Sequence, residues 1–177
     1  MAIFGKLKLG SKSAPKKIKE KIIHHFVFVE VPIEVVWPEV SLWGQAEWWP
    51  KKSAIKIIPI GSGDLEIGSK FRYKIQGLLL PSWQAEVTQL VPENLIERTF
   101  LNGPLKGYES VKLEWRYNGT RLDYELHYRA RGLIYKIIWP LLEKKIYNVS
   151  VKQVLEALRN YVVDKYHKRH ESGLEYT

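Results

Sequence analysis

Tyrosine and tryptophan side chains on alternate positions of short segments are the groups in this sequence best suited to bind a ligand. In residues 70–76, Phe71, Tyr73 and Ile75 alternate with charged or polar residues, and residues 122–130 repeat this pattern. Period-two alternation is typical of a strand with one buried face. An apolar wall with a few hydroxyl groups suits a mostly hydrophobic ligand that has one or two polar groups. The aromatic residues expected to line such a pocket are Tyr73, Trp83, Trp115, Tyr117, Tyr124 and Tyr128.

An alternative is that these rings simply fill a core, because large aromatic side chains bury about 150–250 Å² each and pack well. The number of phenols argues for a pocket, since every buried tyrosine hydroxyl requires a hydrogen-bond partner and a dry core favours phenylalanine. Both interpretations stay open from the sequence alone.

The segment 95–101 carries a charge on each of its two faces. Glu97 lies on one face with Leu95, and Arg98 lies on the other with Ile96 and Phe100. Whichever face turns inward brings a charge into the pocket, which is costly unless that charge is paired or binds something. We expect a bulge that leaves both charges at the rim. Any catalysis would use the tyrosines, Glu97 or Arg98 in general acid–base chemistry, and we assign no catalytic residue.

Several other kinds of chemistry have no support in the sequence. Cysteine is absent, and there is no glycine-rich phosphate loop, nucleophile elbow or HExxH helix. His24 and His25 fall on opposite faces of a strand, and His167 and His170 lie in a basic segment that would repel a cation. We therefore expect no metal and no cofactor, and an enzyme is less favoured than a binding protein.

The elements that would position these side chains follow one another along the chain. We expect a strand over residues 21–31 that ends at Pro32, short helices over 33–40 and 42–49, and then six strands. The dipeptide Asn118-Gly119 predicts a tight hairpin, because a type I′ turn requires positive φ at both central residues. These strands should form a sequential antiparallel sheet.

Residues 133–169 predict one long amphipathic helix, because their apolar residues recur at spacings of three and four. Pro140 should kink this helix. Ser150 and Gln153 fit a capping box, so an alternative is two helices joined near Asn148. The helix should close over the pocket, with Ile138 and Leu142 facing its contents.

The net charge of +9 is concentrated near the N-terminus, where residues 1–21 hold seven lysines against one glutamate. We expect 1–21 to be a basic tail, 22–169 one domain and 170–177 a short C-terminal tail. The tail is a solvated leader, a membrane-surface anchor or, less favourably, a nucleic-acid contact. No secretory signal or membrane span is evident, so we expect a cytoplasmic location, with peripheral membrane contact as a further hypothesis.

Three consecutive leucines form an unusual hairpin tip, which could cap the pocket, pack against the helix or touch a bilayer. Together with the tail, they motivate the hypothesis of contact with an anionic membrane, since stable attachment takes two weak signals. The candidate residues for that contact are Lys6, Lys8, Lys16, Lys17, Leu78, Leu79 and Leu80.

The order of elements, with the runs FVFVEVPIEVVW at 26–37, WWP at 48–50, IGSKF at 67–71 and VPENL at 91–95, resembles the START-like (SRPBCC, pollen-allergen-like) superfamily, especially its polyketide cyclase/dehydrase-type proteins. The resemblance covers about residues 22–169. It implies an α+β helix-grip fold, in which a curved seven-stranded antiparallel sheet wraps around a long C-terminal helix and encloses an apolar cavity.

The resemblance implies two functions, because members of this superfamily include both carriers and enzymes. The first is binding or transport of a hydrophobic small molecule, such as a lipid, quinone or aromatic polyketide. The alternative is a cyclase or dehydratase that acts on a cavity-bound substrate. The resemblance specifies neither the ligand nor an oligomeric state.

Overall fold

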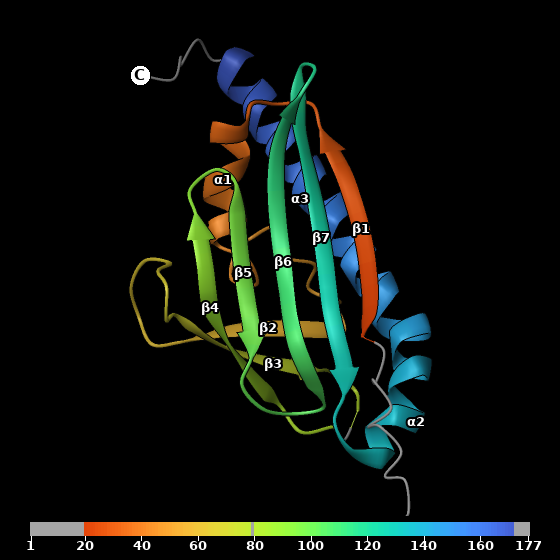
Figure 1. Cartoon of the computed structure of the whole chain (residues 1–177). Coiled ribbons are helices and arrows are strands. Elements are labelled where there is room, and N and C mark those ends of the chain that lie inside the picture. Colours follow the sequence, from red (N-terminus) through yellow and green to blue (C-terminus); the bar gives the residue numbers. More distant parts are fainter. Residues whose placement is uncertain (1–19, 79, 172–177) are drawn as a thin grey trace, which may run out of the picture.

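A seven-stranded antiparallel sheet wraps around the C-terminal helices in the computed structural model, which describes residues 20–78 and 80–171. The strand order is β1-β7-β6-β5-β4-β3-β2, so β1 crosses over to pair with β7 and all other neighbours are consecutive (Figure 1). The predicted helix-grip fold is confirmed. The strands are β1 (Lys21–Val29), β2 (Ile55–Ile60), β3 (Lys70–Ile75), β4 (Trp83–Val91), β5 (Leu95–Phe100), β6 (Leu105–Arg116) and β7 (Gly119–Ala130).

Only one of the two predicted short helices is present. Helix α1 (Ile33–Ser41) begins after Pro32, whose fixed φ suits a helix start. Residues 42–49 form consecutive turns instead, because Gly44 has a φ of +88° and interrupts any helix there. A Cβ at Gly44 would lie 2.6 Å from the Cβ of Ile57, so this turn packs tightly against β2.

The C-terminal helical segment runs without a break from α2 (Gly132–Leu142) through a π-helical turn, η1 (Glu143–Tyr147), into α3 (Asn148–Glu171). The alternative of two helices joined near Asn148 is wrong, because Asn148 has helical φ and ψ of −59° and −39°. The irregularity lies earlier, just after Pro140, which lacks a backbone donor. A π-turn is a recognised way for a helix to absorb such a disturbance.

The core lies between the concave face of the sheet and the inner side of α3. Helix α1 lies near the C-terminal end of α3 and α2 lies at the opposite end of the molecule (Figure 1). The buried side chains of α3 follow helical spacing, which makes this helix the central support of the sheet. They are Ser150, Val151, Val154, Leu155, Leu158 and Val162.

The β6–β7 hairpin differs in one detail from its prediction. Arg116 pairs with Gly119, so the two turn residues are Tyr117 and Asn118, and the positive φ falls on Tyr117 at +57°. Gly119 serves another purpose, since a Cβ there would come within 2.5 Å of the carbonyl oxygen of Val29. The glycine therefore permits the close approach of β1.

Candidate functional site

The space between sheet and helix is occupied mainly by aromatic side chains. Trp43 stacks on Tyr124 with ring centroids 6.1 Å apart, Tyr73 stacks on Trp83 at 5.7 Å, and Trp139 meets Trp83 edge to face. The space left beside Trp43, Glu109 and Tyr147 measures about 10 Å³, which is roughly the room one water requires. The ligand-sized cavity predicted here is therefore not open in this conformation.

A buried cluster of polar side chains lies among these rings, and we call it the polar cluster. Its centre is Glu109 on β6, whose Oε1 accepts a hydrogen bond from Arg98 Nη1 at 3.3 Å and another from the hydroxyl of Tyr73. Its Oε2 accepts the hydroxyl of Tyr124 at 2.9 Å, and the hydroxyl oxygens of Tyr124 and Tyr147 lie 2.6 Å apart. Four strands (β3, β5, β6 and β7) and η1 thus contribute polar groups to one buried cluster.

Burial strongly affects the phenols of the polar cluster. It is the largest cause that raises the pKa of Tyr73, Tyr124 and Tyr147 well above the usual value, and the charge of Glu109 raises each further. These three hydroxyls therefore stay protonated at neutral pH. They act as hydrogen-bond donors and not as bases.

Arg98 retains unused hydrogen-bonding capacity although its side chain is completely buried. Its Nε and Nη2 atoms have no partner among the described residues, and the same holds for the indole Nε1 of Trp83. Nε and Nη2 form one edge of the guanidinium, the edge that binds a carboxylate through two parallel bonds. Orphaned buried donors of this kind are costly and call for an explanation.

The structure brings together six of the ten residues predicted to line the pocket. These six are buried in the interior: Tyr73, Trp83, Arg98, Tyr124, Tyr128 and Leu142. The expectation that both charges of β5 stay at the rim is wrong, because Arg98 turns inward with Ile96 and Phe100. Glu97 lies on the opposite face, where it accepts a hydrogen bond from Thr88.

Three predicted lining residues point elsewhere, and each has a physical reason. Tyr117 is 92% exposed because it forms the hairpin turn, and Trp115 is 51% exposed one step below the projecting tip. Ile138 faces outward because Trp139 and Leu142 occupy the inner side of α2. The prediction that these three line an interior pocket is therefore corrected.

Sequence reasoning missed Glu109 and Tyr147, two members of the polar cluster. Apolar and polar residues also alternate in 111–117, and this pattern continues backwards through Glu109, which shares its face with Val111 and Leu113. Extending that pattern by one pair would have placed a third charge inside the sheet. Tyr147 had no comparable signal, because the π-turn changes which residues of the helix face inward.

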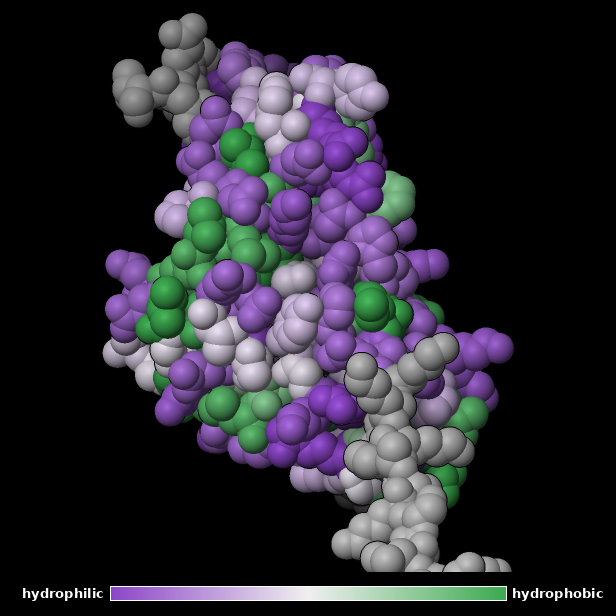
Figure 2. Space-filling model, in the orientation of Figure 1, coloured by the Kyte–Doolittle hydropathy of each residue, from purple (hydrophilic) through white to green (hydrophobic). Residues whose placement is uncertain are grey.

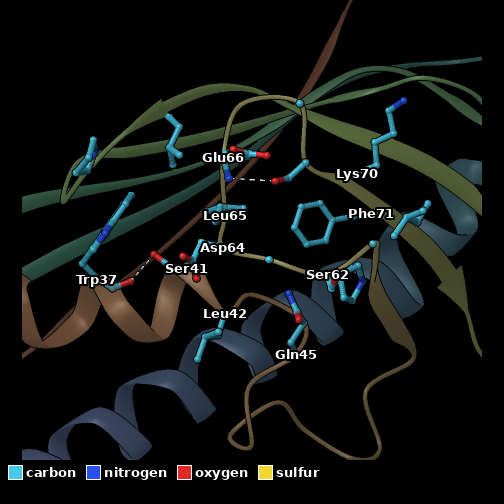
Figure 3. A pocket seen from close by; sticks show the side chains of 18 residues that line it. Trp37, Ser41, Leu42, Gln45, Ser62, Asp64, Leu65, Glu66, Lys70 and Phe71 are labelled. Atoms are coloured by element: carbon cyan, nitrogen blue, oxygen red, sulfur yellow. Dashed lines mark hydrogen bonds between the residues drawn. The ribbon is translucent and has the colours of Figure 1, made fainter.

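A cleft of about 600 Å³ lies between α1 and the β2–β3 loop, outside the predicted pocket. None of the ten predicted residues lines it. Figure 3 shows the ring of Phe71 directed into the cleft between Leu65 and Ser62. Phe71 also packs against the polar cluster, since Arg98 Cζ lies 4.9 Å from the centre of its ring. One aromatic side chain thus contacts both the cleft and the buried guanidinium.

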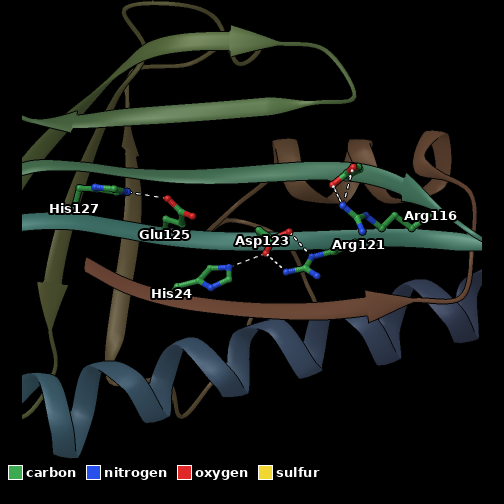
Figure 4. Close-up of polar contacts among 7 residues, drawn as sticks. His24, Arg116, Arg121, Asp123, Glu125 and His127 are labelled. Atoms are coloured by element: carbon green, nitrogen blue, oxygen red, sulfur yellow. Dashed lines mark hydrogen bonds and ion pairs between the residues drawn. The ribbon is translucent and has the colours of Figure 1, made fainter. Parts of the chain in front are cut away.

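The convex face of the sheet carries a solvated network of ion pairs (Figure 4). Asp123 accepts hydrogen bonds from Arg121 Nε and Nη2 at 2.7 Å and lies 2.7 Å from His24 Nε2. The bond from Arg121 is the largest cause that lowers the pKa of Asp123. No group of three or more metal-ligating side chains occurs in residues 20–78 and 80–171. The contact between His24 and Asp123 links β1 to β7 across this face.

Comparison with solved structures shows the same architecture in proteins with different activities. The chain is similar to norcoclaurine synthase from Thalictrum flavum in complex with dopamine and hydroxybenzaldehyde, with a TM-score of 0.62, 17% identity and coverage of 90% of this chain and 97% of that one. It is also similar to the Zhui aromatase/cyclase from Streptomyces sp. R1128, with a TM-score of 0.60, 15% identity and coverage of 81% and 94%. A third similar structure, Ara h 8.0201, has a TM-score of 0.57, 14% identity and coverage of 82% and 99%.

These likenesses confirm the predicted resemblance at the level of the fold: the chain has the helix-grip fold of the START-like (SRPBCC) superfamily. No protein-family model and no curated protein matches the sequence. Within the part of the chain that is described, no helix is both long and apolar enough to cross a bilayer.

Proposed function

We propose that the protein binds a small, mostly hydrophobic molecule in the cleft, and that the polar cluster recognises a carboxylate or a pair of neighbouring oxygens on that molecule. The observation that carries this proposal is Arg98. It is fully buried, the edge formed by its Nε and Nη2 has no partner among the described residues, and it packs against the ring of Phe71, which also lines the cleft.

The size and lining of the cleft support this proposal. A volume of about 600 Å³ lies within the range of about 300–1,000 Å³ that is usual for small-molecule sites. Trp37, Leu42, Leu65 and Phe71 offer apolar surface to the body of a ligand, while Gln45 offers an amide. Rotation of Phe71 would expose the free edge of Arg98 to the cleft. The contact between the guanidinium and the ring would then give way to two charge-assisted hydrogen bonds from Arg98 to the ligand's oxygens.

Among the classes considered from sequence, a fatty-acid-like lipid or an aromatic polyketide fits this edge better than a quinone does. A carboxylate, or two oxygens on neighbouring carbons, can receive both parallel N–H groups. The two oxygens of a simple quinone lie on opposite sides of its ring, so only one can reach Arg98. The proposed ligand class is therefore defined by two closely spaced acceptor oxygens on an apolar body.

A cyclase or dehydratase is the second candidate, because several polar groups converge on Glu109. In such an enzyme the protonated phenols and Arg98 would stabilise negative charge on a substrate oxygen. The donors now satisfy Glu109 itself, so an enzyme would require a substrate oxygen to displace one of them. Because these donors are already bonded to Glu109, the arrangement favours binding over catalysis.

Contact with an anionic membrane through the tail and the leucine tip stays part of the proposal. Leu78 and Leu80 are half-buried and pack against the core, which reduces what the tip can offer to a bilayer. Leu79 and the lysines Lys6, Lys8, Lys16 and Lys17 lie outside the described residues. Changing these four lysines to glutamine in the full chain should weaken binding to phosphatidylserine vesicles, and unchanged binding would exclude the tail as an anchor.

The ligand proposal can be tested by nuclear magnetic resonance titration with 2-naphthoate and with naphthalene, which lacks the two oxygens. Naphthoate should bind more tightly, shift resonances of Trp37 and Phe71, and move the Nε–H resonance of Arg98. The proposal is contradicted if naphthalene binds equally well, or if the resonances of Arg98 and the cleft do not move.

A matched pair of variants keeps this test independent of folding. Arg98→Met combined with Glu109→Gln removes both charges of the buried pair and should abolish the preference for naphthoate. Arg116→Met removes an exposed arginine near the hairpin tip and should leave the preference unchanged. Equal loss in both variants would show that the preference for naphthoate does not depend on the buried arginine, and it would overturn the role of Arg98.

A further inference from the structure

Helix α2 is apolar on both sides, and residues 20–78 and 80–171 cover only one of them. Trp139 and Leu142 pack inward, whereas five residues opposite them are between 37% and 76% exposed. We call these five the outer face of α2: Leu133, Ile134, Ile137, Ile138 and Leu141. Spacings of one, three and four place them along one side of the helix. A contiguous apolar surface of this kind marks an interaction site.

The view in Figure 2 shows hydrophobic atoms reaching the surface at the lower right, where Figure 1 places α2. The segment that contains α2 is strongly basic. Residues 129–152 hold six basic side chains against Glu143 alone, a net charge of +5, and residues 1–21 add +6. The other 132 residues carry −2, so the positive charge of the whole chain belongs to these two segments.

The basic groups surround the outer face of α2. Lys136 lies within α2, and Lys144 and Lys145 follow in η1, all of them exposed. Beside the helix is a hollow of about 150 Å³ lined by Lys21, Arg129 and Lys136 together with Trp139 and Tyr128. Glu143, the one acidic residue of 129–152, accepts a hydrogen bond from the hydroxyl of Tyr128 and lies 3.8 Å from Lys21 Nζ. Glu20, which directly precedes Lys21, is a second acidic residue near this end and is exposed.

We propose that the outer face of α2 docks onto an anionic membrane surface, with α2 lying in the interface plane. An apolar stripe flanked by lysines is the combination that interfacial helices use, because the apolar side enters the headgroup boundary while the cations meet anionic lipid. The hollow beside Trp139 gives an anionic headgroup a place between Lys21, Arg129 and Lys136. Lys21, the last residue of the lysine-rich segment 1–21, lies at this same end.

This surface differs from the leucine tip that was predicted from the sequence, and it does not depend on what the cleft binds. The charge distribution favours a bilayer over a second copy of the chain. Two copies meeting face to face through α2 would bring two +5 segments together, which opposes association. An anionic bilayer supplies both the apolar layer and the opposite charge.

Vesicle co-sedimentation of the full chain tests the proposal, with phosphatidylcholine vesicles prepared with and without phosphatidylserine. The wild-type protein should bind the phosphatidylserine vesicles and release from them as salt is raised. Ile134→Asn combined with Ile137→Asn should weaken binding by about tenfold or more, because two apolar side chains that would enter the bilayer are replaced by polar ones. The matched control, Ile58→Asn with Ile67→Asn, changes two exposed isoleucines away from α2 and should bind like the wild type.

A second pair of variants tests the charges. Lys144→Gln with Lys145→Gln should weaken binding roughly thirtyfold, given about fivefold per lysine. Lys51→Gln with Lys52→Gln removes the same charge elsewhere on the surface and should have little effect. Equal loss in both pairs would show only a dependence on net charge and would overturn docking through α2.

Analytical ultracentrifugation without vesicles completes the test. The proposal predicts that the wild type and the Ile134→Asn/Ile137→Asn variant sediment alike. It is overturned if the wild type self-associates through isoleucines 134 and 137 and fails to bind vesicles, because the outer face of α2 would then be an interface between copies of the chain. The α2 variants that no longer bind vesicles should still bind 2-naphthoate like the wild type. That result would show that ligand binding in the cleft and membrane docking through α2 are independent of each other.

Discussion

The polar cluster and the outer face of α2 depart from ordinary burial in opposite directions. The polar cluster places an arginine and a glutamate in an interior where charged side chains are rare unless paired. The outer face of α2 leaves five large apolar residues in contact with solvent. The segment from Trp139 to Tyr147 connects the two regions, because it contributes Tyr147 to the polar cluster and continues from α2.

This difference teaches how one fold can divide recognition between two places. The interior offers directed donors that are organised by surrounding rings, which suits a ligand of defined shape. The outer face of α2 offers undirected apolar area with flexible lysines around it, which suits a fluid partner. Removing a group from the interior should therefore cost folding stability, whereas removing one from the outer face should cost only binding.

The largest effect is expected when the buried ion pair is broken from one side. Glu109→Ala leaves Arg98 charged and unpaired in the interior, so the free energy of unfolding should fall by about 3–5 kcal/mol. Urea denaturation measures this loss. In the double variant Arg98→Met/Glu109→Gln, the free energy of unfolding should fall by less than half as much, because no charge is left unpaired. If Glu109→Ala lowers it by less than about 1 kcal/mol, water reaches the cluster.

Substitutions on the two sides of α2 sharpen the contrast within a single helix. Trp139→Ala removes a fully buried indole, and the free energy of unfolding should fall by roughly 3 kcal/mol or more. Ile137→Ala should change it by no more than about 0.5 kcal/mol, because the side chain is 69% exposed. Thermal unfolding compares the two. Similar losses would show that the outer face of α2 is covered in solution.

A smaller effect is expected at the tyrosine hydroxyls. Tyr124→Phe removes one donor to Glu109 and should lower the free energy of unfolding by about 1.5–3 kcal/mol, the range for hydrogen bonds to charged groups. Tyr117→Phe is the matched control at the exposed hairpin turn, where no measurable change is expected. If Tyr124→Phe is also neutral in denaturant titration, the polar cluster contributes little to stability.

The smallest effect concerns acid stability and the convex face of the sheet. Arg121 lowers the pKa of Asp123 in the folded state, so the resulting stabilisation is present above the unfolded pKa of about 4. It is lost as pH falls through the lower folded pKa, because the unfolded chain then binds the proton more readily. Asp123→Asn should flatten the decline in stability below about pH 4. An unchanged pH profile would show that other carboxylates dominate it.

The sequence was sufficient for the sheet and its helix because their signals are periodic. Alternation in residues 70–76 and 122–130 predicted the inward positions of Tyr73, Tyr124 and Tyr128, all of which are buried. The same rule failed at Trp115 and Tyr117, because alternation assigns a face and does not say where the sheet extends beyond its covering helix.

The chemistry of the interior was harder to predict because it depends on pairing between distant strands. Arg98 is tolerable inside only because Glu109 faces it across the β5–β6 pair, where the two residues are registered opposite each other. The outer face of α2 was misassigned for a related reason. Ile138 was expected to face the pocket together with Leu142, and nothing local shows which side of this apolar helix the sheet covers.

Native mass spectrometry of protein purified from cells tests the central claim, that Arg98 anchors an oxygen-bearing apolar ligand, most directly. The wild type should carry a bound apolar molecule with a carboxylate or paired oxygens, identified after extraction, and the Arg98→Met/Glu109→Gln variant should carry none. A wild type without any bound molecule, or a variant that carries the same molecule at the same occupancy, would contradict the claim.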